Sequence, residues 1–243
     1  MKRTTVEAGS ALRFVLTVCL ALGLWVSSSG AQSASGSGTI TAEATIYEEA
    51  ASTNGGGYSS VCVGNLSTNR TRRGYVRYTL PAIPSGSTIT RVVLTFRQER
   101  VRFRGTGPKT ATLQLRRVLS AWTEGTGVAA QAACGGGANV PGINWANAPS
   151  VSGLDSGAEA LSTTNGTLAT FDTDVGTDDD GLIVDVQSWV DGADIHGWRV
   201  VVAEENSSDN ARLMTPGVLT VHWTPPVMAI QPASWSRIKS LFD

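Results

Sequence analysis

Hydrophobic and polar residues alternate in short runs along most of this chain, and clusters of Gly, Pro, Asn and Ser separate the runs. Within residues 88–97, Val92, Leu94 and Phe96 fall on one side of an extended strand and polar residues on the other. Residues 218–223 repeat this two-residue period. Such alternation, with one face left to solvent, is typical of antiparallel sheets.

The pattern predicts about nine short strands and an all-β fold of two packed sheets. Only residues 184–190 offer a helical turn as an alternative. The expected strands are residues 40–47, 59–63, 75–80, 88–97, 111–118, 167–171, 182–186, 198–203 and 218–223.

Residues 121–161 are long, Gly-rich and without clear alternation. We expect them to form an excursion off the sandwich. A loop of this length inside a compact domain is usually functional or mobile.

The N-terminus has the composition of a secretory signal peptide, which we place at residues 1–31. Lys2, Arg3 and Arg13 precede or border the apolar run 14–26, and small residues follow at 29–31. The run of 13 apolar residues is shorter than the roughly 20 that span a bilayer. The sequence therefore predicts an exported domain, with no transmembrane segment in the mature chain.

Two further segments flank the expected domain at residues 39–224. Residues 32–38 contain only Gln, Ser, Ala and Gly and are expected to be a flexible tether. Residues 225–243 begin with two prolines, which end the last strand, and then form a polar linker. The tail ends in an amphipathic element, with Trp235, Ile238, Leu241 and Phe242 at helical spacing. It is either a sorting or docking element that contacts cell-envelope components, or a frayed end.

Removal of the leader leaves two cysteines, Cys62 and Cys134, because Cys19 lies within it. An even number of cysteines in an oxidising compartment favours a disulfide, which would fix the long loop to the sheet. The alternative is two separate thiols, one of them buried.

Several segments occur in an order that resembles the DNRLRE-domain family of extracellular proteins. They are residues 74–80 (GYVRYTL) with 83–89 (IPSGSTI), 118–125 (VLSAWTEG), 143–149 (INWANAP), 185–189 (DVQSW) with 197–198 (GW), and 218–223 (VLTVHW). Together they span about residues 42–224. The resemblance implies a jelly-roll sandwich and a class of members that bind polysaccharide, alginate among the ligands. This chain departs from the family pattern at Glu43 and at residues 212–216.

Catalytic motifs are not recognisable. The chain has two histidines, no phosphate-binding loop and no Cys/His cluster. Paired carboxylates, as in glycosidases, or Tyr75 or Tyr78 beside Arg77, as in lyases, are present by residue type, but nothing singles them out. We therefore predict a protein without enzymatic activity and without a catalytic cofactor.

Charge is strongly segregated along the sequence. Residues 66–120 hold twelve basic residues and one acid, Glu99, whereas residues 121–243 hold four basic and fifteen acidic residues. The twelve are Arg70, Arg72, Arg73, Arg77, Arg91, Arg97, Arg100, Arg102, Arg104, Lys109, Arg116 and Arg117. Arginine pairs with carboxylate or sulfate through two parallel hydrogen bonds.

The candidate ligand-binding residues are Arg91, Arg97, Arg116 and Trp145. The three arginines fall on the polar phase of their strands, and Trp145, in the long loop, could stack on a sugar ring. The alternative is that the basic half pairs with the acidic half inside the molecule, or keeps the surface soluble. Trp122, Trp189 and Trp198 are expected to be buried anchors with bonded indole N–H groups.

A carboxylate-rich loop offers a candidate calcium site at Asp172, Asp174, Asp178 and Asp180. The spacing is not that of an EF-hand, and a solvated acidic turn is the alternative.

The resulting hypothesis is a secreted carbohydrate-binding or adhesion domain that prefers uronate or sulfated polysaccharide and does not bind nucleic acid. The alternatives are a structural subunit that contacts other copies of itself, or, less favoured, a polysaccharide-degrading enzyme.

Overall fold

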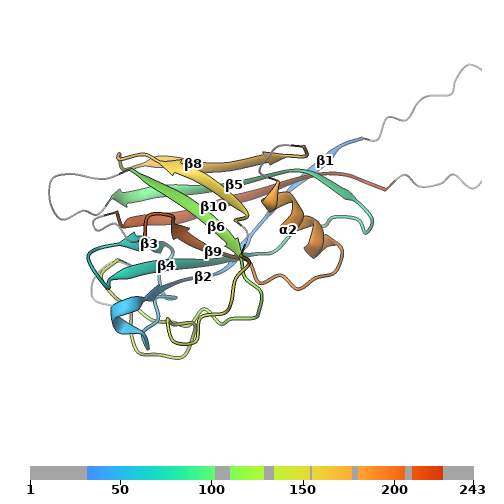
Figure 1. Ribbon diagram of the computed structural model, residues 1–243. Helices are drawn as coiled ribbons and strands as arrows, with labels where there is room; N and C mark the ends of the chain where they lie inside the picture. Colours follow the sequence, from blue (N-terminus) through green and yellow to red (C-terminus); the bar gives the residue numbers. More distant parts are fainter. Residues whose placement is uncertain are drawn as a thin grey trace, which may run out of the picture. The chain divides into compact units, whose positions relative to one another are not determined.

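A computed structural model describes residues 32–101, 110–128, 134–153, 155–176, 180–205 and 210–226. The expected signal peptide and nearly all of the expected tail lie outside these residues. Within the unit 33–243 the chain forms antiparallel strands arranged in two layers (Figure 1). The prediction of an all-β fold is confirmed.

The strands are β1 (Ala34–Gly38), β2 (Ile40–Tyr47), β3 (Val61–Asn65), β4 (Thr71–Tyr78), β5 (Thr88–Val101), β6 (Ala111–Arg117), β7 (Gly157–Leu161), β8 (Thr167–Asp174), β9 (Trp198–Val202) and β10 (Arg212–Thr224). A short 3-10 turn, η1 (Glu48–Ala50), follows β2. We call β1, β10, β5 and β8 sheet A, and β2, β4, β9, β6 and β7 sheet B. Strand β3 pairs with both β10 and β4 and joins the two sheets.

The main core lies between the sheets, where the inward phase of each strand is apolar. Leu94 and Phe96 of β5 meet Phe171 of β8, and Trp198 of β9 packs against Trp189 with ring centroids 4.7 Å apart. These side chains are buried almost completely. Each large apolar side chain removed from water contributes roughly 1.5–3 kcal/mol to folding, so the inward phase of the strands fixes their register.

The prediction of a strand at 182–186 is wrong, because residues Gly181–Val190 form helix α2. Leu182, Val186 and Trp189 recur at helical spacing and all point into the main core. The helix packs against β5 and β8 at one end of the sandwich (Figure 1). The β-branched composition favoured a strand, but the requirement to bury one helical face decides the structure.

The segment expected to be a tether is largely ordered into the sheet. Residues 34–38 form β1, which pairs with β10 from Ala34 opposite Trp223 to Gly38 opposite Leu219. Small side chains are needed here because the strand passes close to the β4–β5 connection. A Cβ atom on Gly38 would lie 2.3 Å from the carbonyl oxygen of Thr79. Residues 34–38 therefore lack large side chains because the space beside β1 is too narrow to hold them.

In residues 119–156, which we call the outer loop, the described parts (119–128, 134–153 and 155–156) do not extend away from the sandwich as expected. They fold over the face of sheet B that points away from sheet A (Figure 1). Val118, Trp122 and Ile143 form a second buried cluster there with Tyr75 of β4 and with alanines of β2. The chain then returns to sheet B as β7.

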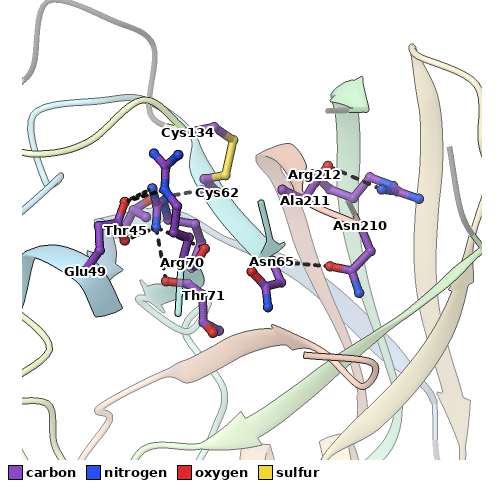
Figure 2. The surroundings of a disulfide bond; sticks show 11 residues. Thr45, Glu49, Cys62, Asn65, Arg70, Thr71, Cys134, Asn210, Ala211 and Arg212 are labelled. Carbon is purple, nitrogen blue, oxygen red and sulfur yellow. Dashed lines mark hydrogen bonds and ion pairs between the residues drawn. A yellow bond between two sulfur atoms is a disulfide. The ribbon is translucent and has the colours of Figure 1, made fainter. Parts of the chain in front are cut away.

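Cys62 and Cys134 form a disulfide that joins β3 to the outer loop, as predicted (Figure 2). Thr45 accepts a hydrogen bond from the backbone N–H of Cys62, and Arg70 and Arg72 pair with Glu49 nearby. Closing a chain segment of 72 residues in this way typically stabilises a domain by 2–4 kcal/mol. The disulfide and its buried surroundings therefore hold the middle of the outer loop against β3.

Candidate anion-binding face

The three arginines expected to form a ladder lie on two different sheets. Arg91 and Arg97 are on β5, in sheet A, whereas Arg116 is on β6, in sheet B. Residues that belong to opposite layers of a sandwich cannot line one outer face. The structure therefore separates Arg116 from the other two.

Each of these arginines also has a carboxylate partner. Arg91 donates two hydrogen bonds to Asp172, at 2.7 and 2.6 Å, and lies 3.7 Å from Asp174. Arg97 lies 3.6 Å from Glu99, and Arg116 lies 2.9 Å from Asp155 without hydrogen-bond geometry. Exposed pairs of this kind contribute little to stability, but they occupy the guanidinium groups that a ligand would need.

The same pairing joins the basic part of the sequence to the acidic part. Arg73 of β4 donates two hydrogen bonds to Glu205, at 2.8 and 2.7 Å. Arg117 lies 3.9 Å from the buried carboxylate of Asp185. Burial raises the pKa of Asp185, while hydrogen bonds from Ser156 and Trp198 oppose that rise. Much of the segregated charge is thus neutralised within the molecule.

The candidate calcium site is not assembled in the described residues. The carboxylates of Asp172 and Asp174 lie against Arg91, whose hydrogen bonds lower the pKa of Asp172. Asp180 precedes α2 and makes no side-chain cap, and Asp178 lies outside the described residues. No group of three or more His, Cys, Asp or Glu in the described segments could hold a metal ion.

Trp145 lies on the outer side of sheet B, as does Arg116, but it is only partly exposed. It packs against the second cluster, and the Arg73 guanidinium lies over its ring at 4.5 Å from the centroid. One face of the indole is therefore already covered by a cation. Trp145 therefore helps to pack the outer loop against sheet B.

A cross-strand row on the outer side of sheet B brings together three residues that sequence order separates. Tyr75 of β4 lies opposite Arg199 of β9, which lies opposite Arg116 of β6. Directly opposed residues have neighbouring side chains. This row, together with Arg73, which lies two residues before Tyr75 on the same face of β4, forms what we call the arginine face.

Arg199 differs from the other arginines of this face. Among the residues that the structure describes, no carboxylate lies within ion-pairing distance of its guanidinium. Its side chain is half-buried, and its Nε is enclosed without a hydrogen-bond partner. The Tyr75 hydroxyl lies beside it, although the two do not form a hydrogen bond of good geometry. Arg199 is thus a cation held in place without a counter-charge in contact.

The electrostatics of this position follow from burial. Desolvation lowers the pKa of Arg199, and Arg73 acts in the same direction, while Tyr75 and Glu205 oppose it. Desolvation also raises the pKa of Tyr75. Because an arginine remains protonated at any physiological pH, the half-buried charge persists and would be stabilised by an anion.

No family model matches this chain, and no curated protein matches it. The likeness to DNRLRE-domain proteins thus stays a prediction that rests on the short segments quoted above.

Arg199 was not among the predicted site residues, because it lies outside the basic stretch 66–120. The signal was nevertheless present in the alternation of the predicted strand 198–203. Trp198 and Val200 are buried in the main core, and Arg199 between them must point outward. Its partners could not be found from sequence, because strand pairing places β9 between β4 and β6.

The tryptophans expected to be anchors are buried. The indole N–H of Trp122 donates to the carbonyl of His196 at 2.8 Å, and that of Trp198 donates to Asp185 at 2.8 Å. The indole N–H of Trp189 has no partner among the described residues. Within the part of the chain that the structure describes, no helix has the length and apolar character needed to cross a bilayer.

Proposed function

We propose that this chain is an exported, non-catalytic domain that binds anionic polysaccharide through the arginine face of sheet B. The observation that carries the proposal is Arg199, a half-buried guanidinium whose charge no described carboxylate contacts. Burying a charge is costly unless it is paired, so the position favours an anionic ligand. The predicted signal peptide supports a ligand outside the cell.

A carboxylate on a sugar suits this position better than a free small ion does. The neighbouring guanidiniums of Arg73 and Arg116 are held by Glu205 and Asp155, which leaves Arg199 as the one arginine of the row with capacity for a new partner among the described residues. A single anchoring charge gives weak binding alone. A polymer with repeated carboxylates can reach the face in many registers and gains by avidity.

The test is the affinity for oligouronates, such as oligogalacturonate, measured by titration calorimetry at low salt. Replacing Arg199 with Gln removes the charge and is expected to weaken binding by roughly 10- to 100-fold, the value of a charge-assisted hydrogen bond. Arg199→Lys keeps the charge but loses the two-pronged geometry, so its affinity should lie between those of the wild type and Arg199→Gln.

Arg97→Gln is the matched control, because Arg97 is an exposed arginine on the opposite sheet. It should bind like the wild type. A wild-type protein that does not bind oligouronates at low salt would overturn the proposal, as would equal affinities for the wild type and a folded Arg199→Gln variant. Thermal unfolding of each variant establishes that it is folded.

A further inference from the structure

A pocket in the outer loop lies beside the arginine face and has a different chemical character. It has a volume of about 290 Å³ and is lined by Ala121, Trp122, Thr123, Gly142, Ile143 and Asn147. None of these residues is charged. Thr123 and Asn147 are exposed and offer a hydroxyl and an amide, while the rings and alkyl groups of Trp122 and Ile143 are buried in the wall.

Hydrogen bonds fix the first wall of the pocket, formed by residues 121–123. The Arg77 guanidinium donates to the carbonyl of Trp122 at 3.2 Å, and the indole N–H of Trp122 donates to His196. The backbone N–H of Ile143 donates to Thr123 at 2.7 Å and ties the two walls together.

The second wall is held equally firmly. Asn54 donates to the carbonyl of Ile143 at 2.6 Å, and Asn147 donates to Gly142 at 3.1 Å and accepts from Asn144 at 2.7 Å. A pocket whose walls are fixed before binding does not lose free energy in ordering them when a ligand arrives. The shape is therefore a property of the free protein.

The pocket and the arginine face are connected by two aromatic rings. Trp122 lines the pocket and meets Tyr75 edge-on, with ring centroids 5.7 Å apart, and Tyr75 lies beside Arg199. Neighbouring residues of one glycan chain can therefore reach both places. At the pocket the protein offers uncharged hydrogen-bonding groups, and at Arg199 it offers a cation.

We infer that the pocket is a second subsite, which takes an uncharged sugar residue, so that the domain recognises a mixed polysaccharide containing both neutral and uronic residues. This inference rests on the proposed function of the arginine face and extends it. A uronate in the pocket would lose its hydration without gaining a cation. A neutral sugar would lose less and would gain hydrogen bonds from Thr123 and Asn147.

The experiment compares two kinds of probe that carry equal numbers of carboxylates. One kind is mixed: oligosaccharides in which N-acetylhexosamine alternates with glucuronate, and xylan fragments that bear glucuronate. The other is oligogalacturonate. At least one mixed probe is expected to bind about 10-fold more tightly than oligogalacturonate.

Ala121→Trp fills the pocket from an exposed position without removing a hydrogen bond, and it should abolish this difference while leaving oligogalacturonate affinity unchanged. Ser120→Trp is the matched control, because Ser120 is the exposed neighbour and does not line the pocket. It should keep the difference.

The possible failures are distinguishable. If oligogalacturonate binds in an Arg199-dependent way but no mixed probe binds more tightly, the pocket inference is wrong and the proposed function stands. The same conclusion follows if Ala121→Trp keeps the preference. If no acidic probe of either kind binds, both proposals are wrong.

Discussion

At the scale of single residues, Asn54 does most to shape the outer loop. Its side-chain amide donates to the carbonyls of Glu124 and Ile143, and its side-chain oxygen accepts from the N–H groups of Gly56 and Gly127. This uses the whole hydrogen-bonding capacity of an asparagine. One buried side chain therefore fixes both walls of the pocket.

Replacing Asn54 with Ala should destabilise the protein by about 3 kcal/mol, because it leaves several buried backbone groups without partners. Urea denaturation measures the change. Asn139→Ala, at an exposed position of the same loop, is the control and should stay within about 0.5 kcal/mol of the wild type. Equal stability of the two variants would show that Asn54 does not hold the loop.

Glu43 makes the stability of the outer loop depend on pH. Burial, and then the neighbouring Glu124 carboxylate, raises the pKa of Glu43 from 4.5 to about 7. The backbone N–H of Glu43 donates to that same Glu124 carboxylate at 2.9 Å. The folded state therefore holds a proton on Glu43 that the unfolded chain has already released above pH 4.5.

The sign of the effect follows from this difference. Between pH 4.5 and 7 the folded state binds more protons than the unfolded state, so the free energy of unfolding falls as pH rises. Glu43→Gln should remove this pH dependence, which changes the free energy of unfolding by on the order of 1 kcal/mol across that range after solvent screening. Denaturation curves across this pH range test it, with Glu99→Gln, on the opposite sheet, as the control. A slope that is unchanged in Glu43→Gln would contradict the assignment.

At the scale of elements, helix α2 and the strand expected from sequence predict different effects of the same substitution at two positions. In a strand, Val184 and Val186 would point to the same side. In the helix, Val186 is buried in the main core and Val184 is 55% exposed. The same substitution at the two positions therefore has two different outcomes.

Val186→Ala should cost roughly 2–3 kcal/mol of unfolding free energy, since it leaves a cavity in a closed core. Val184→Ala should be neutral or slightly stabilising, because alanine favours a helix more than valine does. Chemical denaturation of the two variants, side by side, provides the measurement. Similar losses at both positions would favour a strand.

Alternation located most of the strands, because each has one face in the main core. β2 was predicted with its observed bounds. β5 begins at the predicted residue but runs on to Val101, and β10 ends one residue past the predicted end but already begins at Arg212. The failures have a common cause. β1 and β7 consist largely of small residues whose places depend on β10 and β6, and α2 owes its form to tertiary packing. Local sequence does not contain those partners.

The same reasoning applies to the candidate site. The sequence predicts that Arg116 and Arg199 point outward. It does not show that β9 pairs with β6 and brings these two residues together. Nor does it show that Asp155 lies against Arg116 and Asp172 against Arg91. Which charges are neutralised is a property of strand pairing. The residue with capacity for an anion was therefore visible only in the folded arrangement.

At the scale of the whole molecule, folding pairs part of the basic stretch with part of the acidic stretch. The pairs Arg73–Glu205, Arg91–Asp172, Arg116–Asp155 and Arg117–Asp185 each join the basic stretch to the acidic one. A subunit that assembled head to tail through opposite charges would need those groups on separate surfaces. Here they neutralise each other within a single copy.

This arrangement predicts that the protein does not self-associate through charge. Sedimentation velocity at low and at high salt should show the same monomeric species, because the arginines that could attract a second copy already lie against carboxylates of the same copy and salt screens the other exposed charges over about a Debye length. Breaking the internal pairs at once, with Asp172→Ser, Asp174→Ser and Asp155→Ser, frees Arg91 and Arg116 on opposite sheets. That variant should associate with its own acidic surfaces at low salt and separate when salt is added. Salt-sensitive oligomers of the wild type would instead show that intramolecular pairing leaves enough charge for assembly, and would favour the structural-subunit alternative.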